Sequence, residues 1–256
     1  MRLGVLPKSR KWTQVVALLE GGAALPDVAG ASAEAAERAL QQAADDPLLG
    51  HAVWLLAALP LAARAPGWTE RLRELGLETD GPPSLFELTA ALSATLDKKA
   101  IELGGRTDLG EMAQMALVES LVQTIEPQLP SLFTPDPAEV RTALGRLSGG
   151  ERFGALARTF FSRLTNRSLN YYLSRELANH IGADRRFTTD QERRQFDQSL
   201  ALHCQESARI VEAFAGGWYG KTVWQQDELT PESTQRFARY SFKKIRDELR
   251  RRRDQG

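Results

Sequence analysis

The chain has 256 residues, with 33 basic and 33 acidic side chains and a hydrophobic content of 42%. This composition is typical of a folded globular protein and excludes a highly charged disordered chain. The single cysteine, Cys204, excludes an intramolecular disulfide framework.

No targeting or membrane-spanning segment is predicted. The first twelve residues lack the apolar core of a signal peptide. The most apolar run, residues 48–63, is too short to span a membrane and contains His51 and Pro60. We therefore expect a buried helix there, kinked or ended at Pro60, in a cytoplasmic protein. The abundance of alanine and arginine suggests a bacterial source.

The first third of the chain predicts a small helical module over residues 1–80. Its helices are expected at residues 11–20, 32–44, 47–59 and 70–75, with Ser32 as the cap of the second. Residues 76–83, GLETDGPP, form the best linker candidate because glycine and proline interrupt regular structure. A larger helical domain with a basic C-terminal helix is expected over residues 84–256.

Helix caps divide the larger domain. Ser84 with Glu87 matches a capping box for a helix ending near Leu103. The later helices are expected at residues 108–126, 137–147, 189–214 and from Pro231 onward, in addition to a long one at residues 151–181. Residues 216–227 are expected to form an aromatic loop anchored on the core, or a short strand, since Gly216 and Gly217 resemble a helix stop.

The segment of residues 151–181 predicts a long central helix. It contains apolar residues at helical spacing on two sides, and a helix that is apolar on two sides is usually surrounded by others. The first side contains Phe153, Ala157, Phe160, Leu164, Tyr171 and Ala178, and the second contains Leu169, Leu173 and Leu177. The sequence thus predicts an all-α fold, an irregular multi-helix bundle around this helix, without significant sheet.

The third side of the same helix is polar and basic, with Thr159, Arg163, Asn166, Arg167, Asn170 and Ser174. Arg163, Arg167 and Asn170 are candidate ligands for an anion or a phosphate backbone, because guanidinium groups bind oxyanions through two donors. The alternative is that these arginines pair with acids of neighbouring helices. A fold-back near Asp184 would bring Glu206 close to Arg163 and Arg167.

The charge is unevenly distributed. Residues 1–150 hold 13 basic and 19 acidic residues, whereas residues 151–256 hold 20 and 14. The final helix supplies candidate contacts to nucleic acid or a partner, although Asp247, Glu248 and Asp254 interrupt it. These candidates are Lys243, Lys244, Arg250, Arg251, Arg252 and Arg253. Trp218, Tyr219 and Trp224 are candidate anchors for a protein partner, with core packing as the alternative.

Catalytic and cofactor patterns are weak. Gly220-Lys221-Thr222 resembles the end of a phosphate-binding loop, but Ala215 stands where the first glycine is needed. A metal site between two helices would need Glu176, His180, His203 and Glu206 together, but the expected register separates the two histidines. We therefore predict no metal, no cofactor and no catalytic residue.

Two functions remain open from the sequence. The first is a non-catalytic bacterial adaptor or structural subunit of a multiprotein complex, with a protein partner. The second is a nucleic-acid-binding accessory protein that uses the basic side of the central helix and the basic tail. An enzyme is the third and least supported possibility.

Overall fold

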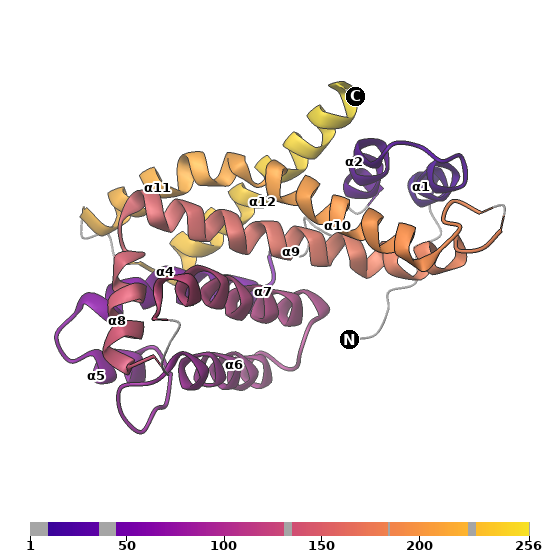
Figure 1. Ribbon diagram of the computed structural model, residues 1–256. Helices are drawn as coiled ribbons and strands as arrows, with labels where there is room; N and C mark the ends of the chain where they lie inside the picture. The colour runs from indigo at the N-terminus through magenta and orange to yellow at the C-terminus, as the bar shows by residue number, and fades with distance from the viewer. Residues whose placement is uncertain (1–9, 36–44, 131–134, 184, 225–228, 256) are drawn as a thin grey trace.

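The computed structural model describes residues 10–35, 45–130, 135–183, 185–224 and 229–255. These residues form α-helices with one short 3-10 helix and one isolated bridge, so the predicted all-α fold is confirmed (Figure 1). The helices are α1 (Arg10–Glu20), α2 (Leu25–Ala35), α4 (Pro47–Arg64), α5 (Trp68–Glu74), α6 (Leu85–Glu102), α7 (Asp108–Ile125), η1 (Glu126–Gln128), α8 (Pro137–Arg146), α9 (Gly150–Asn179), α10 (Asp190–Ser207), α11 (Arg209–Trp224) and α12 (Pro231–Gln255).

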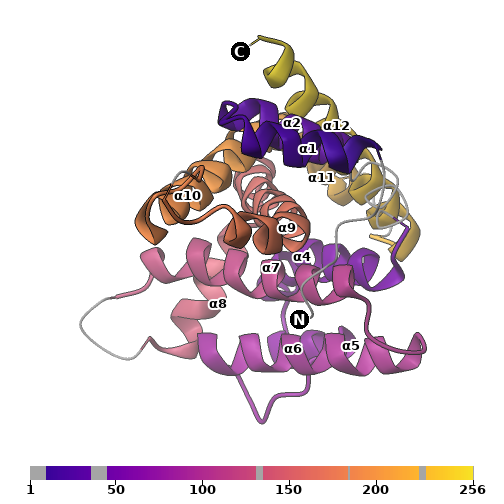
Figure 2. The same ribbon diagram turned by 90° about the vertical axis from the view of Figure 1, so that its right-hand side faces the viewer.

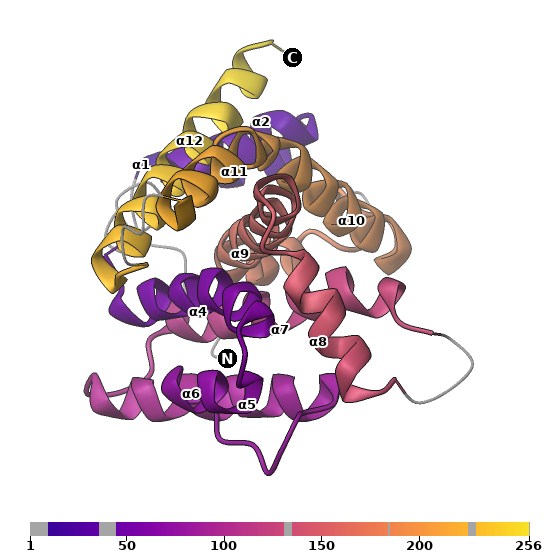
Figure 3. The ribbon, with the colours of Figure 1, turned by 90° about the vertical axis from the view of Figure 1, so that its left-hand side faces the viewer.

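The long central helix is α9, as predicted. It packs against α7, α10, α11 and α2, and Figure 3 shows it in the middle of the molecule. Most of the predicted apolar positions on both sides, from Phe153 to Leu177, are fully buried. Tyr171 and Ala178 are exceptions: Tyr171 is half-buried and Ala178 is exposed, because their side of α9 emerges from the core near its C-terminal end.

The most apolar helix, α4, lies beneath α12 and beside α7 and α8, and α6 forms an outer layer (Figure 2). It does not end at Pro60 but continues to Arg64, with Ala62 and Ala63 buried in its last turn. By length and composition α4 is the one described helix that could cross a membrane, yet 72% of it is buried in the protein. Core helices of water-soluble proteins pass the same test, so this indication is weak.

The helices before and after the predicted linker share one hydrophobic core. In particular, α2 and α4 both pack against α12, although more than half of the chain separates them from it in sequence. The second helix begins at Leu25 instead of Ser32. Ser32 lies inside it and donates a hydrogen bond to the Val28 carbonyl at 2.6 Å. Its predicted extension through residues 36–44 lies outside the described residues.

Several predicted caps are present. The hydroxyl of Ser84 accepts from the Glu87 amide and the Glu87 carboxylate accepts from the Ser84 amide, which completes the capping box of α6. Asp136 and Glu139 make the same arrangement at α8, with Pro137 at the first helical position. Local sequence therefore determines these helix starts.

The predicted loop at residues 216–227 is wrong as far as it is described, because α11 runs without interruption from Arg209 to Trp224. Gly216 does not stop the helix. A Cβ there would lie 2.7 Å from the Gly150 carbonyl oxygen, so glycine allows α11 to touch the backbone of α9. The helix predicted at residues 189–214 is instead interrupted at Ala208, between α10 and α11.

Candidate functional site

A polar groove follows the third side of α9. It consists of two adjoining cavities of about 340 and 600 Å³ that share Arg163 and Asn166. Helix α7 and helix α10 both pack against α9 and lie on different sides of it (Figure 3). We call the lining of both cavities the α9 groove: Glu119, Gln123, Ala155, Arg158, Thr159, Ser162, Arg163, Asn166, Arg167, Asn170, Tyr171, Ser174, Gln198, Ala201, Leu202, Gln205 and Glu212.

The floor of this groove is the polar side that the sequence predicts. Its residues recur at intervals of three and four, which brings them onto one line along a helix. The line contains Thr159, Arg163, Asn166, Asn170 and Ser174, and all of them contact one of the two cavities. The predicted ligands Arg163, Arg167 and Asn170 therefore lie together, on the open side of the central helix.

The two candidate arginines share one acid from α7. Arg163 donates to Glu119 at 2.5 Å, and Arg167 donates to the other carboxylate oxygen of Glu119. Arg163 also donates twice to the Gln123 side-chain oxygen, at 3.2 and 2.8 Å. The sequence-based alternative, pairing with acids of a neighbouring helix, is thus correct for Glu119, although both guanidinium groups still line the groove.

The predicted pairing of Glu206 is wrong. Glu206 lies 3.5 Å from Arg158, with Glu212 on the same guanidinium at 3.0 Å, instead of near Arg163 and Arg167. Glu206 therefore faces α9 more than one helical turn nearer its N-terminus than a fold-back near Asp184 implies.

The other end of the groove holds neutral donors and acceptors. Asn170 donates to the Asn166 side-chain oxygen at 3.1 Å. The Ser174 hydroxyl is buried and has no hydrogen-bond partner among the described residues. Tyr171 donates to Asp108 at 2.6 Å, and this hydrogen bond raises the pKa of Tyr171 to about 12.

The predicted aromatic anchors belong largely to the core. Tyr219 is fully buried, stacks on Phe153 at 3.9 Å between ring centroids, and donates to the Ala57 carbonyl at 3.0 Å. Trp218 is half-buried and stacks on Phe237 at 4.2 Å. Tyr219 is therefore no exposed anchor, because the helical course of α11 turns it inward. The Trp224 side chain lies outside the described residues.

The basic tail is the last part of α12, whose end extends beyond the neighbouring helices (Figure 1). Glu248 pairs with Arg251 at 2.6 Å and with Arg252 at 3.0 Å, and the hydrogen bond from Arg251 lowers the Glu248 pKa. Lys243 is exposed, and the Lys244 ammonium lies 5.4 Å from the Tyr240 ring centroid. Arg250 is half-buried, and the Arg253 side chain is not described.

The weaker chemical candidates do not form sites. In the described part of the chain, no three His, Cys, Asp or Glu side chains come together to hold a metal, and this includes His180 and His203. Burial raises the pKa of the Cys204 thiol to about 12, which makes it a poor nucleophile at neutral pH. Lys221 and Thr222 lie within α11, so they belong to no phosphate-binding loop.

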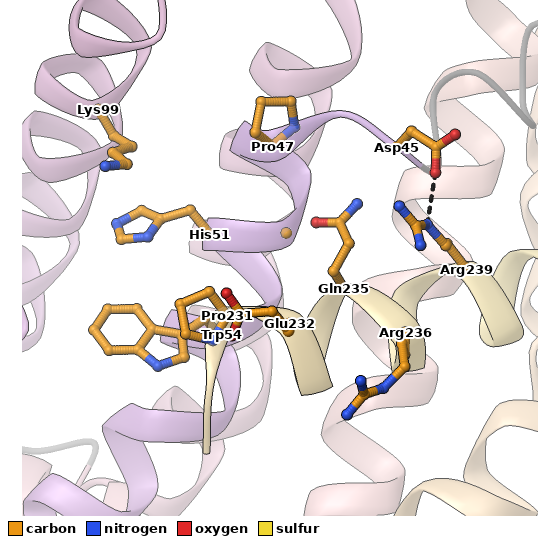
Figure 4. Close-up of a pocket in the computed structure, with 11 residues that line it drawn as sticks. Asp45, Pro47, His51, Trp54, Lys99, Pro231, Glu232, Gln235, Arg236 and Arg239 are labelled. Carbon is orange, nitrogen blue, oxygen red and sulfur yellow. Dashed lines mark ion pairs between the residues drawn. The ribbon is translucent and has the colours of Figure 1, made fainter. Parts of the chain in front are cut away.

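A second hollow, of about 730 Å³, lies where α4, α6 and α12 meet (Figure 4). His51 stacks on Trp54 with 5.2 Å between the ring centroids, and the Trp54 indole donates to the Leu229 carbonyl at 2.9 Å. Burial, together with Lys99, lowers the pKa of His51 to about 4, so this imidazole is neutral at pH 7. On its far side Arg239 pairs with Asp45 at 2.6 Å.

Sequence reasoning missed this hollow and the walls of the α9 groove for the same reason. Their residues come from helices far apart in the chain, and no local pattern indicates which helices meet.

The chain matches no protein-family model, no curated protein and no solved structure at a significant level.

Proposed function

We propose that this protein is a non-catalytic adaptor that binds an extended polypeptide segment of a partner protein in the α9 groove. Charge supports a polypeptide over a polyanion. Each groove arginine already has an acidic neighbour: Arg163 and Arg167 have Glu119, and Arg158 has Glu206 and Glu212. A surface of alternating charge repels a continuous phosphate backbone as much as it attracts it.

The length of the groove supports an extended segment. Its floor runs from Thr159 to Ser174 along one helix. At 1.5 Å per residue this is about 22 Å. An extended chain advances by about 3.3 Å per residue, so about seven residues would fit.

The chemistry of the lining fits peptide groups. Side-chain amides can donate and accept at once, as a peptide bond requires, and the groove holds five of them. They come from three helices: Gln123 from α7, Asn166 and Asn170 from α9, and Gln198 and Gln205 from α10. Leu202 on the wall is 61% exposed, which offers an apolar contact to a side chain of the bound segment.

Selection from a displayed library of random heptapeptides on the immobilised full-length protein tests this proposal. We expect enriched peptides that bind wild type and lose at least about tenfold in affinity with Asn166→Trp, because the indole would fill the floor of the groove. Ala90→Trp, on the exposed side of α6, is the matched control and should bind normally. Circular dichroism checks that both variants fold.

Two results would reject the adaptor proposal. One is the absence of any enriched peptide, and the other is a set of peptides that bind Asn166→Trp as tightly as wild type.

The nucleic-acid alternative rests on the projecting basic end of α12. A salt titration with duplex and single-stranded DNA, with and without residues 243–256, measures it directly, and we expect no binding at physiological salt.

A further inference from the structure

The two arginines that share Glu119 differ in their remaining hydrogen bonds. Arg163 uses its other donors on the Gln123 side-chain oxygen. Arg167 has the Met115 sulfur, at 3.7 Å, as its second partner among the described residues. A thioether is a weak acceptor, so Arg167 keeps donor capacity that Arg163 has already used.

The surroundings of Arg167 are rich in donors. Asn170 and Ser174 line the same cavity of about 340 Å³, and the buried Ser174 hydroxyl has no partner among the described residues. A buried polar atom without a hydrogen bond destabilises the folded protein, and a ligand atom placed there would remove that penalty. Two guanidinium groups share the single Glu119 carboxylate, so one positive charge at this end is not neutralised by it.

We propose that Arg167, Asn170 and Ser174 form a carboxylate subsite at this end of the α9 groove; this inference rests on the proposed binding of an extended polypeptide. The bound segment would place there either an Asp or Glu side chain or its own C-terminal carboxylate. A monoanion matches the one positive charge that Glu119 leaves unpaired, and Asp108, the acceptor of the Tyr171 hydroxyl beside the cavity, disfavours a phosphate dianion more strongly than a monoanion.

The experiment uses heptapeptides selected on the full-length protein, each made in three forms: the parent, a form with Asp and Glu replaced by Asn and Gln, and a form with an amidated C-terminus. Fluorescence anisotropy gives the affinity of each form for wild type, Arg167→Gln and Arg163→Gln. We expect at least one neutralised form to bind wild type about tenfold more weakly than the parent, because hydrogen bonds to charged groups are the strong ones.

The two variants separate binding from folding, because each leaves Glu119 one arginine partner. Arg167→Gln should bind parent and neutralised peptides equally, whereas Arg163→Gln, which removes the excess charge but keeps the donors of Arg167, should retain part of the preference for the parent. The form that loses affinity identifies the source of the carboxylate.

Three results would overturn the subsite. The first is equal affinity of all three peptide forms for wild type. The second is loss of the preference in Arg163→Gln to the same extent as in Arg167→Gln. The third is stronger competition by inorganic phosphate than by acetate. The adaptor proposal would survive each of these, whereas a failure to select any heptapeptide removes both proposals.

Discussion

Helix α9 has a closed side and an open side, and the two are built from different interactions. On the closed side, toward α11 and α12, Phe153, Phe160 and Phe161 are fully buried among other aromatic rings. On the open side, toward the groove, Arg163, Asn166 and Arg167 are half-buried, and the two arginines contact polar groups of α7. One helix therefore serves both as the centre of the core and as the floor of a surface groove.

The difference between the two sides indicates where this chain tolerates amino-acid substitutions. Close packing on the closed side leaves no room for an added atom. On the open side, ion pairs near solvent contribute little to stability and exchange partners readily. Substitutions on the closed side should therefore alter the free energy of unfolding, and those on the open side should alter binding.

The largest effect is expected at the crossing of α9 and α11. Gly216→Ala places a Cβ 2.7 Å from the Gly150 carbonyl oxygen, and backbone cannot move aside as a flexible side chain can. We expect a loss of about 1–3 kcal/mol in the free energy of unfolding, measured by urea denaturation. Gly217→Ala is the matched control: nothing lies within 4 Å, and alanine in a helix should stabilise by about 0.5–1 kcal/mol. Equal effects at the two glycines would contradict the packing of α11.

A smaller effect is expected from Tyr219→Phe, which removes one hydroxyl and leaves the ring stack intact. The hydroxyl donates to the Ala57 carbonyl at 3.0 Å and ties α11 to α4. A net loss of about 1 kcal/mol is expected, since that is typical of a buried neutral hydrogen bond. Thermal unfolding measures it, with Tyr240→Phe, at a 47% exposed position, as the control. If both variants unfold at the same temperature as wild type, the Tyr219 hydroxyl does not stabilise the fold.

The smallest effect on stability is expected from Glu119→Gln on the open side. Glu119 pairs with two arginines, but its side chain is 37% exposed, and exposed ion pairs contribute about 0–1 kcal/mol. The same change should increase the affinity for peptides that carry a carboxylate, because it removes the internal competitor. A loss of stability above about 2 kcal/mol would show that this ion pair is part of the core and not of a binding surface.

The sequence predicts those features that depend on local patterns. The course of α9, its polar side, and the caps at Ser84 and Asp136 all follow from residue spacing. The walls of the groove could not be predicted, because Gln123 and Leu202 reach it through the packing of α7 and α10. The register of α10 depends on the connection that follows α9, where the bridge between Ile181 and Phe187 has no local signature.

Two glycines led to a wrong prediction of where a helix ends. Gly216 and Gly217 resemble a helix stop, and nothing in the neighbouring residues indicates that α9 lies against one of them. Only tertiary contact separates a glycine that ends a helix from one that admits a second backbone. The same error led to the interpretation of Tyr219 as a candidate partner anchor, with core packing only as the alternative.

Photocrosslinking at the groove wall tests the central proposal most directly. Benzoylphenylalanine replaces Leu202, whose side chain is 61% exposed on α10, and in a control protein it replaces Phe86, which is 81% exposed on α6. The account predicts that a selected heptapeptide crosslinks to position 202 and not to position 86, and that excess unlabelled peptide abolishes the crosslink. Crosslinking at position 86 alone, or equally at both positions, would contradict the groove as the binding site.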